Sequence, residues 1–156
     1  MVTVIKAPNL MSVDEVFDFT IFLAGSIEMG KAVDWQTKLA QQLSPFSDVT
    51  LFNPRREAWD SSWVQSINNP KFLEQVEWEL DHIESSDLVV FYFDPATKSP
   101  ISLLELGIVC ASRKDAIVCC PPDFYRKGNV DITCAKYHVD VVETIEELIT
   151  EIKHRL

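Results

Sequence analysis

The amino-acid sequence predicts an α/β domain built on an open, mostly parallel sheet with helices on both faces. Short apolar runs alternate with segments of helical spacing along most of the chain. The run at residues 87–93 is apolar at every position after its first, as in a parallel strand that is buried on both faces. Strands and helices that alternate in this way need crossover connections, which favour parallel pairing in a three-layer domain.

Five strands are expected, at residues 18–25, 48–54, 87–93, 115–120 and 137–142. Residues 2–5 can add an edge strand at the start of the chain. Helices are expected at residues 31–43, 70–85 and 144–156, with another that begins at Ser99-Pro100.

The helix starts carry recognisable signals. Asn69 precedes Pro70 as Ser99 precedes Pro100, and both pairs suit an N-cap followed by the first helical residue. Thr144 and Glu147 have the spacing of a capping box.

The composition and net charge of the chain limit the classes of protein to which it can belong. The 156 residues are 47% hydrophobic and 24% charged, as in one globular domain that spans residues 1–156. A net charge of -10 argues against nucleic-acid polymers and anionic membranes as partners, which leaves small molecules. The chain has no apolar run long enough to cross a bilayer and no signal-peptide pattern, so a cytoplasmic protein is expected.

Cysteine and histidine spacing fits no metal site. The cysteines lie in or beside predicted core segments and are interpreted as small buried hydrophobes. They are Cys110, Cys119, Cys120 and Cys134. The histidines, His82, His138 and His154, are also badly spaced for ligation, so neither metal nor cofactor is expected.

In such sheets ligands bind at the carboxyl ends of the strands, where the strand order reverses. Three loops should meet there, at residues 24–31, 53–59 and 93–100. They carry most of the polar side chains that could do chemistry.

Glu105 is the one charged residue in the stretch "SPISLLELGIVCAS", residues 99–112. Helical geometry places it between Ile101 and Ile108 on one side and Val109 on the other, inside the apolar face, with Ile101, Leu104 and Ile108 as core anchors. A buried carboxylate costs several kcal/mol unless it is paired. Glu105 is therefore either a core carboxylate with a partner or a functional group. The positive end of its helix would help to keep it ionised, and Gly107 leaves room for another backbone or a ligand.

Glu79 lies at the edge of the apolar stripe of the preceding helix. That stripe is Phe72, Leu73, Val76, Leu80 and Ile83. Glu79 is either a boundary residue whose carboxylate reaches water or a partner of Glu105. Two carboxylates that face one pocket suit glycosyl transfer, in which one attacks the anomeric carbon and the other handles the proton of the leaving group. Asp87 is interpreted as a structural residue.

Four stretches, "IFLAGSI", "ELDHIESSDLVVFYF", "SPISLLELG" and "RKGNVDI", resemble the nucleoside 2-deoxyribosyltransferase-like family. Its superfamily also contains the deoxynucleoside 5'-monophosphate N-hydrolases, and the match runs in order over residues 20 to 132. The resemblance implies a flavodoxin-like, Rossmann-type domain. It makes Glu105 the nucleophile that takes the sugar and Glu79 the group that assists the base or its proton. Family members commonly have Asp at the position of Glu79.

The resemblance also implies an oligomer. It matches Asn129 to a loop asparagine that reaches into a neighbouring subunit's site, so a homodimer or larger assembly is expected. Trp59 and Trp63 either stack on the base as a flap or dock onto the domain surface.

The resemblance leaves the 5'-position of the sugar open. The hydrolases hold a 5'-phosphate with serines that correspond to Ser26, which follows Gly25, and to Ser99. Glu28 in the first loop opposes a phosphate, although Lys31, Arg55 and Arg56 could compensate. From the residues alone, Ser26 and Ser99 are equally well explained as helix caps.

Three functions therefore remain. The first is N-glycosidic cleavage of a (deoxy)nucleoside with transfer of the sugar to another base or to water, and the second is the same cleavage of a 5'-monophosphate. The third is a nucleotide-binding module without turnover. The expected catalytic residues are Glu105 and Glu79, and the expected substrate-binding residues are Gly25, Ser26, Arg55, Trp59, Ser99 and Asn129.

Overall fold

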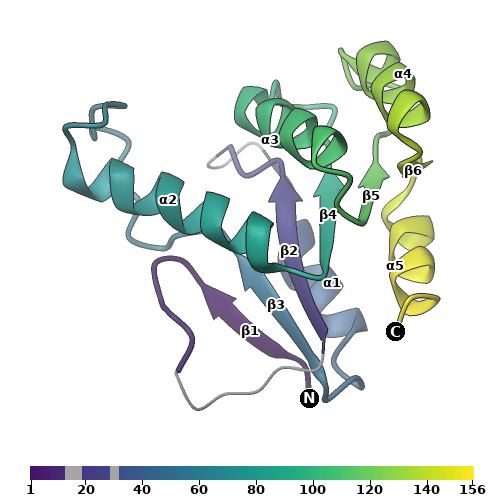
Figure 1. The fold of residues 1–156 in the computed structure, drawn as a ribbon, viewed down its shortest axis with the longest axis horizontal. Coiled ribbons are helices and arrows are strands. Elements are labelled where there is room, and N and C mark those ends of the chain that lie inside the picture. Colours follow the sequence, from purple (N-terminus) through teal and green to yellow (C-terminus); the bar gives the residue numbers. More distant parts are fainter. Residues whose placement is uncertain (13–18, 29–31) are drawn as a thin grey trace.

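A computed structural model describes residues 1–12, 19–28 and 32–156. Its sheet has six parallel strands in the order β1-β3-β2-β4-β5-β6 (Figure 1). The strands are β1 (Thr3–Lys6), β2 (Phe19–Gly25), β3 (Val49–Asn53), β4 (Leu88–Tyr92), β5 (Ala116–Cys119) and β6 (Asp140–Val142). The helices are α1 (Trp35–Gln42), α2 (Pro70–Ser85), α3 (Pro100–Ala111), α4 (Lys127–Tyr137) and α5 (Ile145–Lys153).

The two faces of the sheet carry separate cores. On one face α1 and α5 pack through side chains such as Trp35 and Leu148, and on the other α2, α3 and α4 pack through Trp78, Val109 and Val130. Strand β4 supplies both cores, because alternate side chains of a strand point to opposite faces. The predicted three-layer fold is confirmed.

The edge strand forms, and β1 pairs in parallel with β3. Helix α4 is an element that the periodicity did not predict. Only Val130 and Cys134 are buried along it, which is too sparse a pattern to indicate a helix from sequence.

Helix α3 buries a different face from the expected one. Ile101, Leu104 and Ile108 are 58%, 62% and 41% exposed, so they do not anchor the helix in the core. The buried residues are Ser102, Glu105, Leu106, Val109 and Cys110. The helix is apolar on nearly all sides, so periodicity could not orient it.

Helix α2 is also rotated from the expected stripe. Its buried residues are Gln75, Trp78, His82 and Ile83, whereas Leu80 is 41% exposed. The Trp78 ring stacks on His82, and both rings pack against Phe52 of β3. Because of this aromatic packing, polar side chains of α2 lie in the interface between α2 and the sheet. A search for a hydrophobic stripe does not find such side chains.

The cap predictions have mixed outcomes. Asn69 caps α2, and Thr144 and Glu147 form the capping box of α5. Helix α1 begins at Trp35 with Asp34 as its N-cap, so Ser26 does not cap it. Ser99 occupies the N-cap position of α3, but its side chain makes no capping hydrogen bond.

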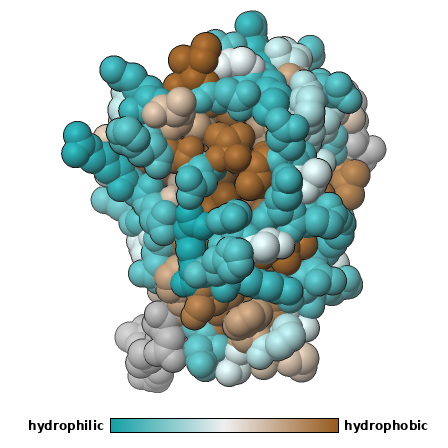
Figure 2. Space-filling model, turned by 90° about the vertical axis from the view of Figure 1, so that its right-hand side faces the viewer, coloured by the Kyte–Doolittle hydropathy of each residue, from teal (hydrophilic) through white to brown (hydrophobic). Residues whose placement is uncertain are grey.

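All four cysteines are buried free thiols, as expected of small hydrophobes. In the described part of the chain no helix is long and apolar enough to cross a membrane. Seen from the side of α4, β6 and α5, the surface is largely hydrophilic, with an apolar area near the middle of the view (Figure 2).

Candidate active site

The strand order reverses between β2 and β4, and their carboxyl ends meet at Gly25 and Tyr92. Gly25 has φ +125°, and a Cβ at this position would overlap the Tyr92 backbone. Only glycine fits here, because L residues rarely adopt this φ and the close approach leaves no space. The next backbone N–H, that of Ser26, donates to the Tyr92 carbonyl at 2.8 Å. The role of Gly25 is therefore to bring Ser26 against β4.

Three buried hydroxyl groups form a closed cluster beside this junction. The hydroxyl oxygens of Ser26 and Ser99 are 2.6 Å apart, and that of Thr97 lies 2.9 Å from Ser26 and 2.8 Å from Ser99. The backbone N–H of Asp94 donates to the Ser26 hydroxyl at 2.8 Å. Ser99 has left-handed backbone angles (φ 46°, ψ 52°), and its hydroxyl belongs to this cluster. The two serines thus hold the loops together rather than cap helices.

Glu28 occupies the start of helix α3. Its Oε1 accepts hydrogen bonds from the backbone N–H groups of Lys98 and Ser99, each at 2.9 Å. Backbone N–H groups at a helix N-terminus favour a negative charge. In this protein the negative charge at that position is the chain's own carboxylate. Lys31 lies outside the described residues.

Glu105 is a buried carboxyl group in the second turn of α3, 7% exposed. Burial, with a smaller contribution from the charge of Glu79, raises the pKa of Glu105 to about 8. The helix N-terminus therefore does not keep this group ionised as expected, because desolvation is the larger effect. Its Oε2 has no hydrogen-bond partner among the described residues. That favours a functional group over a fully paired core carboxylate.

Glu79 lies on α2, half-buried, close enough for its charge to act on Glu105. Burial raises the pKa of Glu79 to about 7, and a hydrogen bond from Gln75 opposes that rise. The Gln75 Nε2 donates to Glu79 Oε1 at 2.8 Å and to the Pro54 carbonyl at 2.9 Å. The two expected catalytic carboxyl groups are thus neighbours from different helices.

The two arginines that follow β3 point to different helices. Arg55 Nη2 donates to Gln36 Oε1 at 3.3 Å, on α1. Arg56 is buried, pairs with Glu74 of α2 at 2.8 Å and lies 5.1 Å from the centre of the Trp63 ring. Among the described contacts, neither arginine pairs with Glu79 or Glu105.

Trp59 and Trp63 pack on each other with ring centres 5.0 Å apart. Trp59 also lies 6.5 Å from Phe72 in the first turn of α2. In this arrangement the pair docks on the domain surface, which is one of the two expected alternatives.

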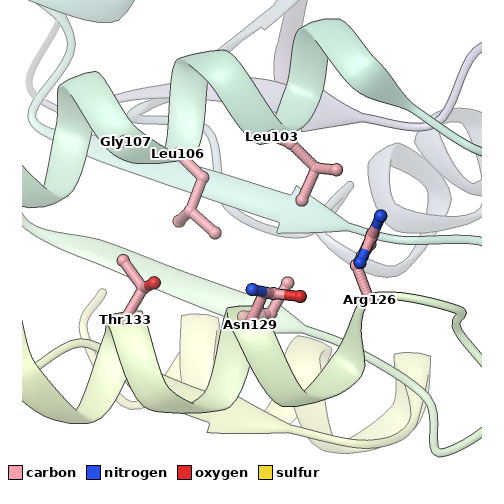
Figure 3. A pocket seen from close by; sticks show the side chains of 7 residues that line it. Leu103, Leu106, Gly107, Arg126, Asn129 and Thr133 are labelled. Carbon is pink, nitrogen blue, oxygen red and sulfur yellow. The ribbon is translucent and has the colours of Figure 1, made fainter.

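Asn129 is not in a loop. It is exposed on α4 and lines a cavity of about 310 Å³ between α3 and α4 (Figure 3). Gly107 lines the same cavity, about 200° around α3 from Glu105 at 100° per residue. Neither residue therefore faces Glu105 within one chain, so Gly107 leaves room as expected, but that room lies at this cavity and not beside Glu105.

Other polar residues have structural roles or were missed. Asp87 accepts hydrogen bonds from both the N–H and the hydroxyl of Thr20, at 2.8 and 2.7 Å, and so connects β4 to β2.

Gln75 and Thr97 were not predicted as site residues from the sequence. The spacing of Gln75, four residues before Glu79, was its one sequence signal. The described residues contain no group of side chains that could hold a metal ion.

An open α/β domain in which a buried and a half-buried carboxyl group from α2 and α3 interact defines a class of candidate enzymes. The family model described as "Nucleoside 2-deoxyribosyltransferase like" matches residues 18–124, and the chain belongs to that family.

A solved structure supports the fold. The crystal structure of a conserved protein from Enterococcus faecalis V583 is 19% identical, covers 88% of this chain and 99% of its own, and superposes with a TM-score of 0.62. At this identity the likeness concerns the fold alone. No curated protein matches the chain.

Proposed function

We propose that this protein cleaves the N-glycosidic bond of a (deoxy)nucleoside through a covalent glycosyl intermediate on Glu105 and passes the sugar to another base or to water. The observation that carries the proposal is the buried Glu105 carboxyl group, with one oxygen unpaired, beside a second carboxyl group of raised pKa. Membership of the family supports the same chemistry.

In the first step the Glu105 carboxylate attacks the anomeric carbon, and the bond to the base breaks with its electron pair passing to the base nitrogen. Glu79 donates a proton to the departing base. In the second step another base or water attacks the anomeric carbon and the ester bond to Glu105 breaks. Glu79 takes back the proton of the incoming nucleophile, which restores both groups.

This cycle needs one proton on the pair. Burial is the main cause of both raised pKa values, about 7 for Glu79 and about 8 for Glu105, and the charge of Glu79 raises the pKa of Glu105 further. The two groups therefore titrate as a coupled pair. Because the pKa of Glu105 is the higher of the two, the single proton resides mainly on Glu105, and the active form, with Glu79 protonated and Glu105 ionised, is the minor of the two singly protonated forms.

The Glu28 contacts favour a nucleoside over a 5'-monophosphate. Glu105 is six residues beyond Ser99, about 9 Å along the helix at 1.5 Å per residue. A sugar held at Glu105 can direct its 5'-group to the start of α3, where Glu28 already accepts two N–H bonds. A phosphate there would meet a like charge, whereas a 5'-hydroxyl can donate to the carboxylate.

A monophosphate N-glycosidase is the second candidate, supported by the hydroxyl groups of Ser26 and Ser99 near that position. Incubating the protein with deoxynucleosides plus a second free base, and separately with deoxynucleoside monophosphates, separates the two. Base exchange supports transfer, free deoxyribose supports nucleoside hydrolysis, and free sugar phosphate supports the second candidate. Glu28→Gln should raise activity on monophosphates relative to nucleosides.

The decisive experiment traps the intermediate. After brief exposure to a 2-fluorinated deoxynucleoside, mass spectrometry should find a sugar adduct on Glu105. An adduct on another carboxylate would refute the assignment. Ligand binding with no turnover in the wild type, and with affinity unchanged in Glu105→Ala, would instead indicate a binding module.

We also propose that the active form is a homo-oligomer in the cytoplasm that acts on small nucleosides. Helix α3 exposes three large apolar side chains, Ile101, Leu104 and Ile108, beside the cavity that Asn129 lines. A second copy that packs on this face would cover them and bring Asn129 near the subunit interface.

A further inference from the structure

Gln75 is a buried amide, 5% exposed, whose orientation is determined by its partners. Its Nε2 donates one hydrogen to the Pro54 carbonyl and the other to Glu79 Oε1. Both partners are acceptors when Glu79 is ionised, and the carbonyl is an acceptor always. Turning the amide over would place its oxygen against the Pro54 carbonyl oxygen, so the NH₂ group must face these two atoms.

This orientation leaves the amide oxygen without a partner. Among the described residues, no donor forms a hydrogen bond to Gln75 Oε1, although this atom is buried away from solvent. Glu105 Oε2 is in the same condition. Buried polar atoms without partners are rare in proteins and call for an explanation such as a bound group. The two unpaired oxygens belong to the amide that holds Glu79 and to the carboxyl group that interacts with Glu79.

We propose, on the basis of the proposed function, that Gln75 determines base specificity. Its Oε1 accepts a hydrogen bond from an N–H group of the substrate base, while its NH₂ group holds Glu79 Oε1 and leaves Oε2 to carry the proton. The class of substrate is then a nucleoside whose base carries an amino group or a ring N–H.

The same contact explains how base binding and proton transfer are linked. One side chain touches both the base and the acid, so a base that pairs with Gln75 is positioned relative to Glu79 Oε2. A base without the N–H leaves Gln75 Oε1 buried and unpaired in the complex. Sites built to accept a particular hydrogen bond reject analogues that lack it far more strongly than apolar pockets reject a missing methylene.

The test compares bases with and without an N–H group. Deoxyadenosine and deoxyinosine are measured against purine deoxynucleoside, whose base has none. Deoxycytidine is measured against its 2-pyrimidinone analogue for the pyrimidine series. In the wild type we expect kcat/KM for the N–H bases to be about 10-fold or more above that of the analogue in the series turned over. Equal values would overturn the proposal.

Gln75→Met removes the amide and keeps a similar volume. The preference should fall to within about threefold in this variant, because the acceptor is lost. Its pH profile should also shift to higher pH, since the Gln75 hydrogen bond that lowers the pKa of Glu79 is lost, while the burial that raises this pKa and the neighbouring Glu105 carboxyl group remain. A residue that only holds Glu79 would shift the pH profile when replaced but would leave the base preference unchanged, so the base preference is the deciding measurement. An unchanged preference would refute the proposal.

Gln36→Met is the matched control. Gln36 is also a fully buried amide with one unpaired polar atom, but it lies on α1 against Arg55. The Gln36→Met variant should keep the wild-type preference for bases with an N–H group and the wild-type pH profile. Should Gln75→Met not fold, Gln75→Asn is tested in the same way, since its shorter side chain withdraws the same atoms. A sugar adduct on Glu105 without any effect of Gln75 would reject this inference alone, whereas absence of the adduct would reject the proposed function.

Discussion

At the scale of single residues, Glu105 shows how burial and function oppose each other. Its carboxyl group is 7% exposed and belongs to no ion pair among the described residues, so the folded protein favours its protonated form. An unfolded chain has the ordinary pKa of 4.5. The raised pKa therefore costs stability wherever the unfolded chain has released the proton.

Glu105→Gln should stabilise the protein at alkaline pH. The contribution of protonated Glu105 is complete below pH 4.5 and is lost as pH rises through about 8. The neutral amide avoids that loss, so the variant should gain stability over the wild type, on the order of a few kcal/mol at pH 8.5, and much less at pH 4.5. Thermal unfolding at the two pH values measures this, and an equal difference at both would contradict it. The same variant should lose turnover.

The carboxyl pair also predicts a bell-shaped pH dependence. With pKa values of about 7 and about 8, the singly protonated pair is most populated between these values. The kcat/KM for cleavage should therefore peak near pH 7.5 and fall on both sides. A profile that is flat from pH 5 to pH 9 would mean that the pair does not carry the proton.

At the scale of elements, the junction between β2 and β4 depends on one glycine. Gly25→Ala places a methyl group against the Tyr92 backbone at φ +125°, so both strain and overlap oppose it. We expect a loss of about 3 kcal/mol or more, measured by denaturant unfolding.

Gly107→Ala provides the matched control for this substitution. An added Cβ at Gly107 has no atom within 4 Å, and the residue lies inside helix α3. Alanine is the better helix former, so we expect a gain of about 0.5–1 kcal/mol. Equal effects of the two substitutions would show that the close approach at Gly25 is not what requires glycine.

Element identity was more predictable than element orientation. Strand β4 and helix α2 were predicted because a continuous apolar run and an Asn-Pro start are strong local signals. The prediction of which face of α3 is buried was wrong, since a helix with isoleucine and leucine on its outer side has no clear hydrophobic stripe. Periodicity indicates which residues are apolar, whereas the face that a helix buries also depends on the side chains of the neighbouring helices and strands.

At the scale of the whole molecule, the candidate site was predictable where residues and strand ends coincide. The switch point placed Gly25, Ser26 and Ser99 together because parallel strands end at one edge of the sheet. The Gln75–Glu79 contact could not be predicted, since it depends on the rotation of α2 set by aromatic packing with β3. Asn129 was misplaced in a loop because α4 has only two buried residues.

The exposed face of α3 leads to a prediction about assembly. Ile101, Leu104 and Ile108 share one side of the helix, and three such side chains are costly to leave in water on a small domain. We expect light scattering to find a dimer or larger species for the wild type and a smaller one for Leu104→Glu, since a charge at the centre of the face would oppose its burial. Gln41→Glu adds the same charge on α1, across the sheet, and should leave the mass unchanged. If Asn129 acts in a neighbouring site, Leu104→Glu should also lose activity while it stays folded, whereas a wild-type monomer with full activity would rule out a shared site.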